Sequence, residues 1–144
     1  IFALLPADYL WGFDRLISGL RQPVLGMCLG QQLMCSFSEE GDTTCLGIFN
    51  VEVKRFIPPG KIPHMGWNSL HRIRGKLFPG ISEEAYVYFV HSYYVPVCDT
   101  TSAICNYLDH FSAALEKDNF FATQFHPEKS GDIGHQILKN FIAL

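Results

Sequence analysis

The stretch Pro23-Val-Leu-Gly-Met-Cys-Leu-Gly-Gln-Gln32 decides how this sequence folds. Its first half is a short apolar run opened by a proline, which is typical of the start of a buried strand. Its second half continues into residues with helical spacing, which predict a helix from Leu29 to Phe37. Gly26-Met-Cys-Leu-Gly30 therefore lies at a sharp turn from a strand into a helix, with a small residue two positions to either side of Cys28.

Cys28 is the candidate nucleophile at this turn. Its sulfur is expected at the N-terminus of the helix, where the positive end of the helix dipole and the free N–H groups favour a thiolate. The backbone N–H of Leu29 is then available to stabilise an oxyanion. The alternative is a buried structural cysteine between two glycines, and a partner base is needed to decide between the two interpretations.

The segment Phe125-His-Pro-Glu128 supplies a candidate base. Pro127 favours extended backbone at His126, and residues i and i+2 of an extended chain project to the same side. Glu128 is therefore expected to bond one ring nitrogen of His126 and to leave the other nitrogen facing a nucleophile. Together with Cys28 this makes an acyl-transfer triad, whereas His126 on its own would be interpreted as an ordinary surface histidine.

The composition limits the class of protein that can carry this triad. The 144 residues suffice for about one domain. With 48% hydrophobic and 17% charged residues, the chain is not intrinsically disordered. A net charge of -3 argues against nucleic-acid binding, and no run approaches the ~20 apolar residues of a membrane span. Five cysteines without a C-x-x-C pair predict a cytoplasmic protein with no disulfide framework and no metal site.

Helices and strands are mixed along the chain, so the sequence predicts one α/β domain over residues 1–144. Helical spacing favours further helices at two segments, 8–20 and 131–144. Segments rich in aromatic and β-branched residues predict strands at 48–56, 69–74, 85–97, 102–107, 112–117 and 120–125.

Two segments resemble the class I glutamine amidotransferases, which hydrolyse glutamine to glutamate and ammonia through a thioester on a cysteine. They are the stretch from Pro23 to Gln32 and the stretch Gln124-Phe-His-Pro-Glu128. The resemblance implies a flavodoxin-like mixed sheet flanked by helices, and no cofactor. It also implies that Cys28 is the nucleophile, His126 the general base and acid, and Glu128 the group that orients the histidine.

Further segments resemble the glutaminase subunit of imidazole glycerol phosphate synthase. They are Lys61-Ile-Pro-His-Met-Gly-Trp-Asn68, Tyr88-Phe-Val-His-Ser-Tyr-Tyr94 and Phe125-His-Pro-Glu-Lys-Ser130. The resemblance implies that the site binds glutamine with Leu29, Gln32, Glu40, Ser92 and Tyr93. Its partner would be a (β/α)8 barrel cyclase of histidine biosynthesis, contacted through Met65, Trp67, Asn68 and Lys129. The cyclase would use the ammonia to make imidazole glycerol phosphate and an aminoimidazole carboxamide ribotide.

Two histidines within these segments, His64 and His91, are interpreted as structural, hydrogen-bonded residues. The family pattern also includes a first strand and a glycine-rich oxyanion loop that this sequence lacks, so we expect a sheet without its N-terminal strands. One alternative is a glutaminase that serves pyridoxal phosphate or nucleotide synthesis, and the His64 to Asn68 segment counts against it. Another is a non-catalytic relative that binds glutamine without turnover, and the intact triad counts against that.

Overall fold

The computed structural model of this chain describes residues 12–144. The helix predicted over residues 8–20 lies partly outside them. In chain order the elements are α2 (Phe13–Ser18), β1 (Val24–Met27), α3 (Leu29–Leu33), β2 (Phe37–Ser38), β3 (Thr43–Thr44), β4 (Glu52–Arg55), β5 (His64–Ser69), β6 (Tyr86–His91), β7 (Tyr93–Tyr94), β8 (Thr101–Asn106), β9 (His110–Lys117), β10 (Phe120–Thr123), the 3-10 helix η2 (Pro127–Lys129) and α4 (Gly131–Ile142).

The central sheet has the strand order β1-β10-β9-β8 and is mixed, as predicted. β1 runs parallel to β10, with Val24 opposite Phe120 and Met27 opposite Thr123, and the remaining pairs are antiparallel. The carboxyl ends of β1 and β10 therefore meet at one edge of the sheet. This register places the residue after β1, Cys28, beside the residues that follow β10, and the N–H of Cys28 donates to the carbonyl of Thr123 at 2.7 Å.

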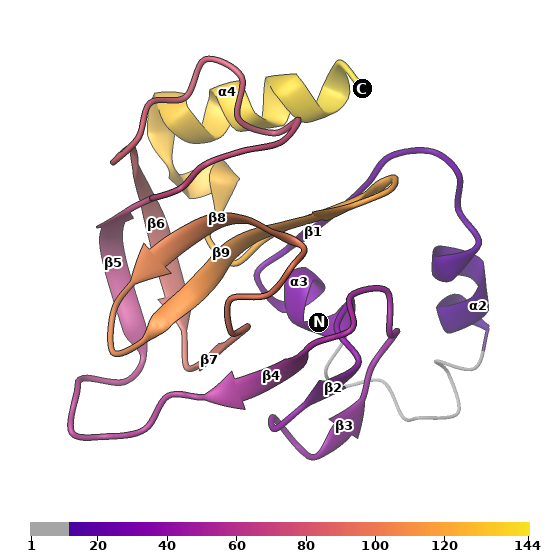
Figure 1. The fold of residues 1–144 in the computed structure, drawn as a ribbon, viewed down its shortest axis with the longest axis horizontal. Helices are drawn as coiled ribbons and strands as arrows, with labels where there is room; N and C mark the ends of the chain where they lie inside the picture. Colours follow the sequence, from indigo (N-terminus) through magenta and orange to yellow (C-terminus); the bar gives the residue numbers. More distant parts are fainter. Residues whose placement is uncertain (1–11) are drawn as a thin grey trace.

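Both faces of β10 are covered, which explains why its residues form an unbroken buried run. Phe121 belongs to a core cluster on the side of α4, and its ring contacts that of Phe141 with centroids 6.0 Å apart. Its neighbours Phe120 and Ala122 belong to the second cluster, which also contains Met34 just after α3. Helices thus flank the central sheet, with α4 above it in the view of Figure 1 and α3 beside β1.

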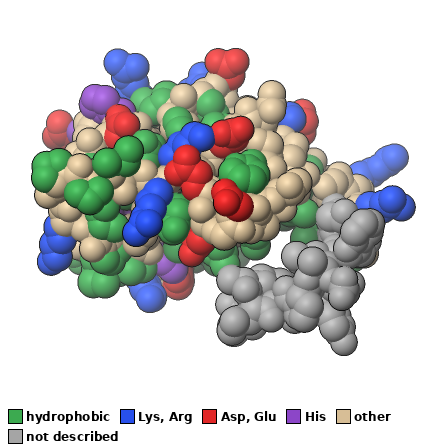
Figure 2. Space-filling view, turned by 90° about the horizontal axis from the view of Figure 1, so that it is seen from below, with side chains coloured by type: hydrophobic (Ala, Val, Ile, Leu, Met, Phe, Trp, Pro, Cys, Tyr) green, Lys and Arg blue, Asp and Glu red, His purple; other side chains and the backbone are tan. Residues whose placement is uncertain are grey.

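Two smaller sheets complete the fold. One has the strand order β3-β2-β4-β7, and the other pairs β5 with β6 in antiparallel register. The face seen in Figure 2 mixes acidic and basic side chains. At the surface of β4, Nζ of Lys54 lies 3.4 Å from Oε1 of Glu39 and 2.7 Å from Oε2 of Glu52. Such exposed ion pairs add little stability. Among residues 12–144, no helix has the length and apolar character needed to cross a bilayer.

Several predicted elements are wrong in their bounds. The strand expected over residues 48–56 covers only Glu52–Arg55, and the strand expected over residues 85–97 is divided into β6 and β7. The helix expected as far as Phe37 ends at Leu33, because Phe37 pairs with Thr44 and Glu52 as part of β2. The strand expected over residues 69–74 lies earlier, over His64–Ser69, where its partner is β6. The paired strands β8 and β9, the strand β10 and the helix α4 are confirmed. The errors at Phe37 and at residues 69–74 arise because these segments pair with distant strands, and local spacing does not encode such pairing.

Candidate active site

Cys28 occupies a strained turn between β1 and α3. Its backbone has φ 52° and ψ -107°, in a region that non-glycine residues rarely adopt. A Cβ at Gly26 would lie 2.8 Å from the backbone carbon and oxygen of Gly30, so the strand and the first helical turn approach too closely for any larger residue at position 26. The turn that presents the sulfur therefore requires a glycine at position 26, whereas a Cβ at Gly30 would meet no atom within 4 Å.

The sulfur of Cys28 rests in partly buried surroundings that favour the neutral thiol. Burial raises the pKa of the Cys28 thiol, and the charges of Glu128 and Glu40 raise that pKa further. A hydrogen bond from the backbone of Leu29 and the charge of Lys129 act in the opposite direction on the same pKa. Formation of the thiolate therefore requires a nearby base.

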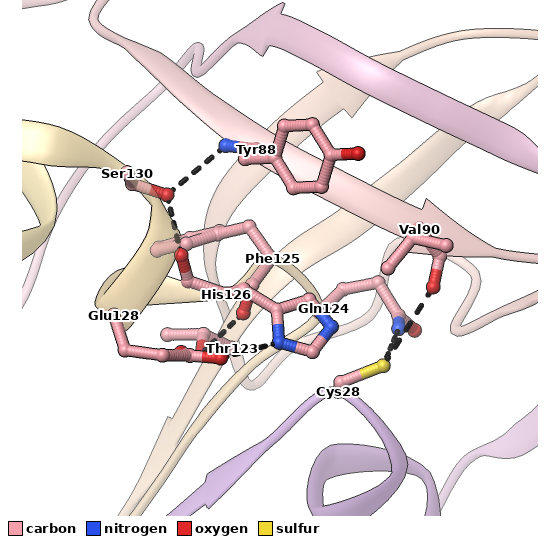
Figure 3. Close-up of polar contacts among 9 residues, drawn as sticks. All are labelled: Cys28, Tyr88, Val90, Thr123, Gln124, Phe125, His126, Glu128 and Ser130. Carbon is pink, nitrogen blue, oxygen red and sulfur yellow. Dashed lines mark hydrogen bonds and ion pairs between the residues drawn. The ribbon is translucent and has the colours of Figure 1, made fainter.

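His126 has the geometry of that base. Its backbone is extended at φ -97° and ψ 96°, as Pro127 predicts. Its Nδ1 lies 2.7 Å from Oε1 of Glu128, whereas its buried Nε2 has no hydrogen-bond partner. Figure 3 shows the ring with Nδ1 toward Glu128 and Nε2 on the side of Cys28. One nitrogen is thus held by the carboxylate, and the other has no hydrogen-bond partner on the side of Cys28.

A serine that the triad prediction did not include fixes the backbone of His126. The hydroxyl of Ser130 donates to the carbonyl of His126 at 2.6 Å and accepts from the N–H of Tyr88 at 3.0 Å. The N–H of His126 donates to the carbonyl of Tyr88 at 2.9 Å. These bonds, drawn in part in Figure 3, attach both the N–H and the carbonyl of His126 to Tyr88 of β6.

The residues predicted to bind glutamine lie in different environments. Gln32 is buried, and its Nε2 donates to the carbonyl of Tyr93 at 3.1 Å. Glu40 is exposed, yet its charge acts on Cys28. The carbonyl of Ser92 accepts from the N–H of Phe56 at 3.1 Å. The carbonyls of Ser92 and Tyr93 are therefore engaged within the protein.

The residues predicted to face a partner separate into two groups. Met65 and Trp67 share one face of β5 and are 58% and 53% exposed. Asn68 instead uses its side chain internally, with its Nδ2 3.0 Å from the carbonyl oxygen of Asn106. Lys129 is exposed next to the catalytic candidates, and Trp67 contacts the ring of Tyr88 edge-on at 5.9 Å between centroids.

His64 and His91 form a buried pair whose ring nitrogens all have partners, as predicted for structural histidines. Nδ1 of His64 lies 3.0 Å from Nε2 of His91, and Nδ1 of His91 lies 2.7 Å from the carbonyl oxygen of Tyr93. Nε2 of His64 lies 3.3 Å from Nδ2 of Asn68. Burial lowers the pKa of His64 to about 4 and that of His91 to about 3, so both rings are neutral at pH 7.

The site also contains a buried glutamine, Gln124, whose side chain sequence reasoning did not single out. It lies directly after β10, within 3.8 Å of the sulfur of Cys28. The signal that could have identified Gln124 is its position at the end of β10, the strand that runs parallel to β1 and so ends beside the nucleophile. No group of three His, Cys, Asp or Glu side chains among residues 12–144 could hold a metal ion.

A family comparison agrees with this arrangement. The family described as glutamine amidotransferase class-I matches residues 7–144, and the chain belongs to that family.

Individual relatives show which group within this family the chain resembles. The chain is 61% identical over 136 residues to "Imidazole glycerol phosphate synthase subunit HisH" of Bacteroides thetaiotaomicron, an alignment that covers 92% of this chain and 69% of the relative. It is 53% identical over 132 residues to the protein of the same name from Pectobacterium atrosepticum, covering 90% of this chain and 67% of that relative. Within the class I family, the chain therefore groups with the HisH subunits.

Solved structures share the fold at low sequence identity. A glutamine amidotransferase from Thermotoga maritima superposes with a TM-score of 0.58 at 18% identity, over 94% of this chain and 52% of that one. The glutaminase domain of Trypanosoma brucei CTPS with bound acivicin gives a TM-score of 0.57 at 16% identity, over 90% of this chain and 64% of that one. These likenesses establish the class I fold of the chain.

Proposed function

We propose that this chain hydrolyses glutamine to glutamate and ammonia through a thioester on Cys28. The observation that carries the proposal is the buried, unpartnered Nε2 of His126 beside a cysteine at a strained turn. The other nitrogen of the same ring is held by Glu128. A buried nitrogen without a hydrogen-bond partner costs folding free energy, and a catalytic role is one reason for a protein to keep it. Proton transfer from the thiol is the step that this position supports.

In the first half of the reaction, Nε2 of His126 takes the proton of the Cys28 thiol, and the sulfur attacks the carboxamide carbon of glutamine. The backbone N–H of Leu29 stabilises the negative charge that develops on the carboxamide oxygen. The imidazolium then gives its proton to the leaving nitrogen, so that ammonia departs and a thioester remains. Glu128 stabilises the imidazolium during these steps.

In the second half, water attacks the thioester carbon while Nε2 of His126 takes one of its protons. The carbon–sulfur bond breaks, glutamate leaves, and the proton returns to the sulfur of Cys28. The exposed carboxylate of Glu40 supports recognition of the α-ammonium group of glutamine. The N–H groups near Ser92 and Tyr93 are proposed to bind its α-carboxylate, since the carbonyls of these residues are already engaged.

We further propose that the ammonia serves a (β/α)8 barrel cyclase that makes imidazole glycerol phosphate in histidine biosynthesis. The names of the relatives support this assignment, and so does the exposed pair of Met65 and Trp67, because exposed aromatic and methionine side chains are enriched at interfaces. Five cysteines without a disulfide support a cytoplasmic location.

Ammonia release from glutamine tests the function, measured with and without the barrel cyclase and its nucleotide substrate. We expect strong stimulation by the partner and complete loss in Cys28→Ala, with the complex still assembled. Activity that ignores this partner would reassign the ammonia to another acceptor. Activity retained by Cys28→Ala would reject the thioester mechanism.

The partner surface has its own test. Trp67→Ala should weaken assembly with the cyclase by about 2 kcal/mol, as expected for a buried aromatic anchor. Ile57→Ala is a matched control, because Ile57 is also a large exposed apolar residue, 79% exposed, outside the predicted surface. Equal affinities for the two variants, measured by titration calorimetry, would remove Trp67 from the interface.

A further inference from the structure

Two buried glutamines connect the sulfur of Cys28 to a fixed backbone carbonyl. Gln124 is fully buried and Gln32 is 5% exposed. Nε2 of Gln32 donates to the carbonyl of Tyr93 at 3.1 Å and to Oε1 of Gln124 at 3.0 Å. Nε2 of Gln124 in turn lies 3.8 Å from the sulfur of Cys28, an interaction drawn in Figure 3.

The carbonyl of Tyr93 fixes the orientation of both amides. A backbone carbonyl only accepts hydrogen bonds, so the end of Gln32 that faces Tyr93 must be its NH2 group. The same NH2 group contacts Gln124, which must therefore present its oxygen there and its own NH2 group to the sulfur. Reversing either amide would bring two acceptors or two donors together in a buried place.

The sulfur thus lies between an acceptor and a donor. The thiol donates to the carbonyl of Val90 at 3.8 Å, which suits the protonated form. Nε2 of Gln124 offers a hydrogen that suits the thiolate. Two nearby carboxylates, Glu128 and Glu40, and burial itself oppose the negative charge, so a donor at this place acts against the main obstacles to ionisation.

We propose that Nε2 of Gln124 stabilises the thiolate of Cys28 as the thiol proton passes to His126, and that Gln32 is a positioning residue that holds Gln124 in the required orientation. This inference rests on the proposed function, because it concerns the same sulfur. It also assigns Gln32 a role distinct from contact with glutamine, since its NH2 group is already used on Tyr93 and Gln124.

The chain offers a matched control for this pair. Gln31 lies beside Gln32 on α3 and is also fully buried. Its Nε2 donates to the carbonyl of Ser112 at 3.0 Å, and among the described contacts no hydrogen bond joins this side chain to the sulfur of Cys28. Gln31→Met therefore removes a buried amide of the same size from the same helix without removing a donor to the sulfur.

The test measures the rate of alkylation of Cys28 by iodoacetamide as a function of pH, in the full chain, with each cysteine followed by peptide mass spectrometry. The thiolate is the reacting form, so the pH midpoint of the rate reports the ionisation of this thiol. The variants are Gln124→Met, Gln124→Glu, Gln32→Met and Gln31→Met, with Cys28→Ser as the blank. Cys45, which is partly buried outside this cluster, is the reference thiol in every digest.

We expect the Cys28 midpoint to move to higher pH in Gln124→Met, with a rate at pH 7 lower by about tenfold or more, as for a lost hydrogen bond to a charged group. Gln124→Glu keeps the shape of the side chain but adds negative charge, so its shift should be larger. Gln32→Met should shift the midpoint less, because Gln124 retains its NH2 group but loses its orientation. Gln31→Met should leave the Cys28 midpoint unchanged.

An unchanged Cys28 midpoint in Gln124→Met would overturn the inference, as would an equal shift in Gln31→Met. A variant that unfolds reveals itself by labelling of the buried Cys35 and Cys105, and Gln124→Glu and Gln32→Met then decide the matter. Failure of the proposed function gives a different result, in which the Cys28 midpoints shift as expected but no variant, nor the parent chain, releases ammonia from glutamine.

Discussion

The chain contains two places where histidines meet polar partners, and they differ in what is left unpaired. At His126, one ring nitrogen is bonded to Glu128 and the other, although buried, has no partner. In the pair formed by His64 and His91, every ring nitrogen has a partner within the protein. The first arrangement leaves a nitrogen able to move a proton, and the second is complete without a substrate.

This contrast separates a candidate catalytic histidine from structural histidines within one fold. Both places lie at or beside β6, and both contain imidazoles that are largely buried. Burial alone therefore does not identify the base. A carboxylate on one nitrogen together with an unsatisfied second nitrogen does.

The largest expected effect separates the two places by activity. His126→Gln should lower ammonia release by about 1,000-fold, because it removes the general base and acid. His91→Gln should retain activity within about tenfold, since His91 moves no proton in the mechanism. Steady-state assays of the two folded variants make the comparison. Comparable losses in both would break the distinction.

Stability should show the opposite order. His91→Ala leaves Nδ1 of His64 unpaired, removes one of the two donors to the carbonyl of Tyr93 and opens a cavity, so we expect a loss of about 2–4 kcal/mol in the free energy of unfolding. His126→Ala should cost less than about 1 kcal/mol, because its partner Glu128 has a side chain 46% exposed. Urea unfolding of both variants with equal m-values gives the two numbers. A larger cost at His126 would contradict this account.

Glu128→Gln tests whether the carboxylate matters to the nitrogen that is left free. We expect ammonia release to fall by about 100-fold, less than for a fully buried triad carboxylate, because water can partly replace this exposed group. The binding of glutamine should change little. A Glu128→Gln variant with the parent turnover number would remove Glu128 from the triad.

The last comparison concerns pH and the paired histidines. Their pKa values, about 4 for His64 and about 3 for His91, lie below the ordinary 6.5. The unfolded chain therefore binds more protons than the folded one below about pH 6.5, and stability falls as the pH decreases through this window. Urea midpoints between pH 7 and pH 4 should fall more steeply in the parent chain than in His91→Asn. Parallel curves would show that the pair does not titrate in this way.

Sequence alone predicts the parts of the site that depend on local geometry. The turn at Cys28 follows from the spacing of Gly26 and Gly30, and the contact between His126 and Glu128 follows from Pro127. The mixed central sheet and the pairing of β8 with β9 could also be expected from apolar patterning and from the family resemblance.

Other features depend on chain segments that meet only in the folded protein. Gln124 reaches Cys28 because β10 pairs with β1 in parallel register, across 96 residues of sequence. The side chain of Asn68 bonds His64 on the same strand and Asn106 on β8, because β5 turns alternate residues to opposite sides. Local spacing encodes neither the register nor the direction of such side chains.

In the proposed mechanism, Cys28 forms a covalent intermediate with the help of His126. The most direct test is labelling of the chain by a glutamine-derived electrophile in the presence of the barrel cyclase, with the adduct located by mass spectrometry. We expect one adduct, on Cys28, and we expect excess glutamine to prevent it. His126→Gln should greatly slow its formation, whereas His91→Gln should leave its formation unchanged. Absence of an adduct on Cys28, or equal labelling of the parent chain and His126→Gln, would contradict this mechanism.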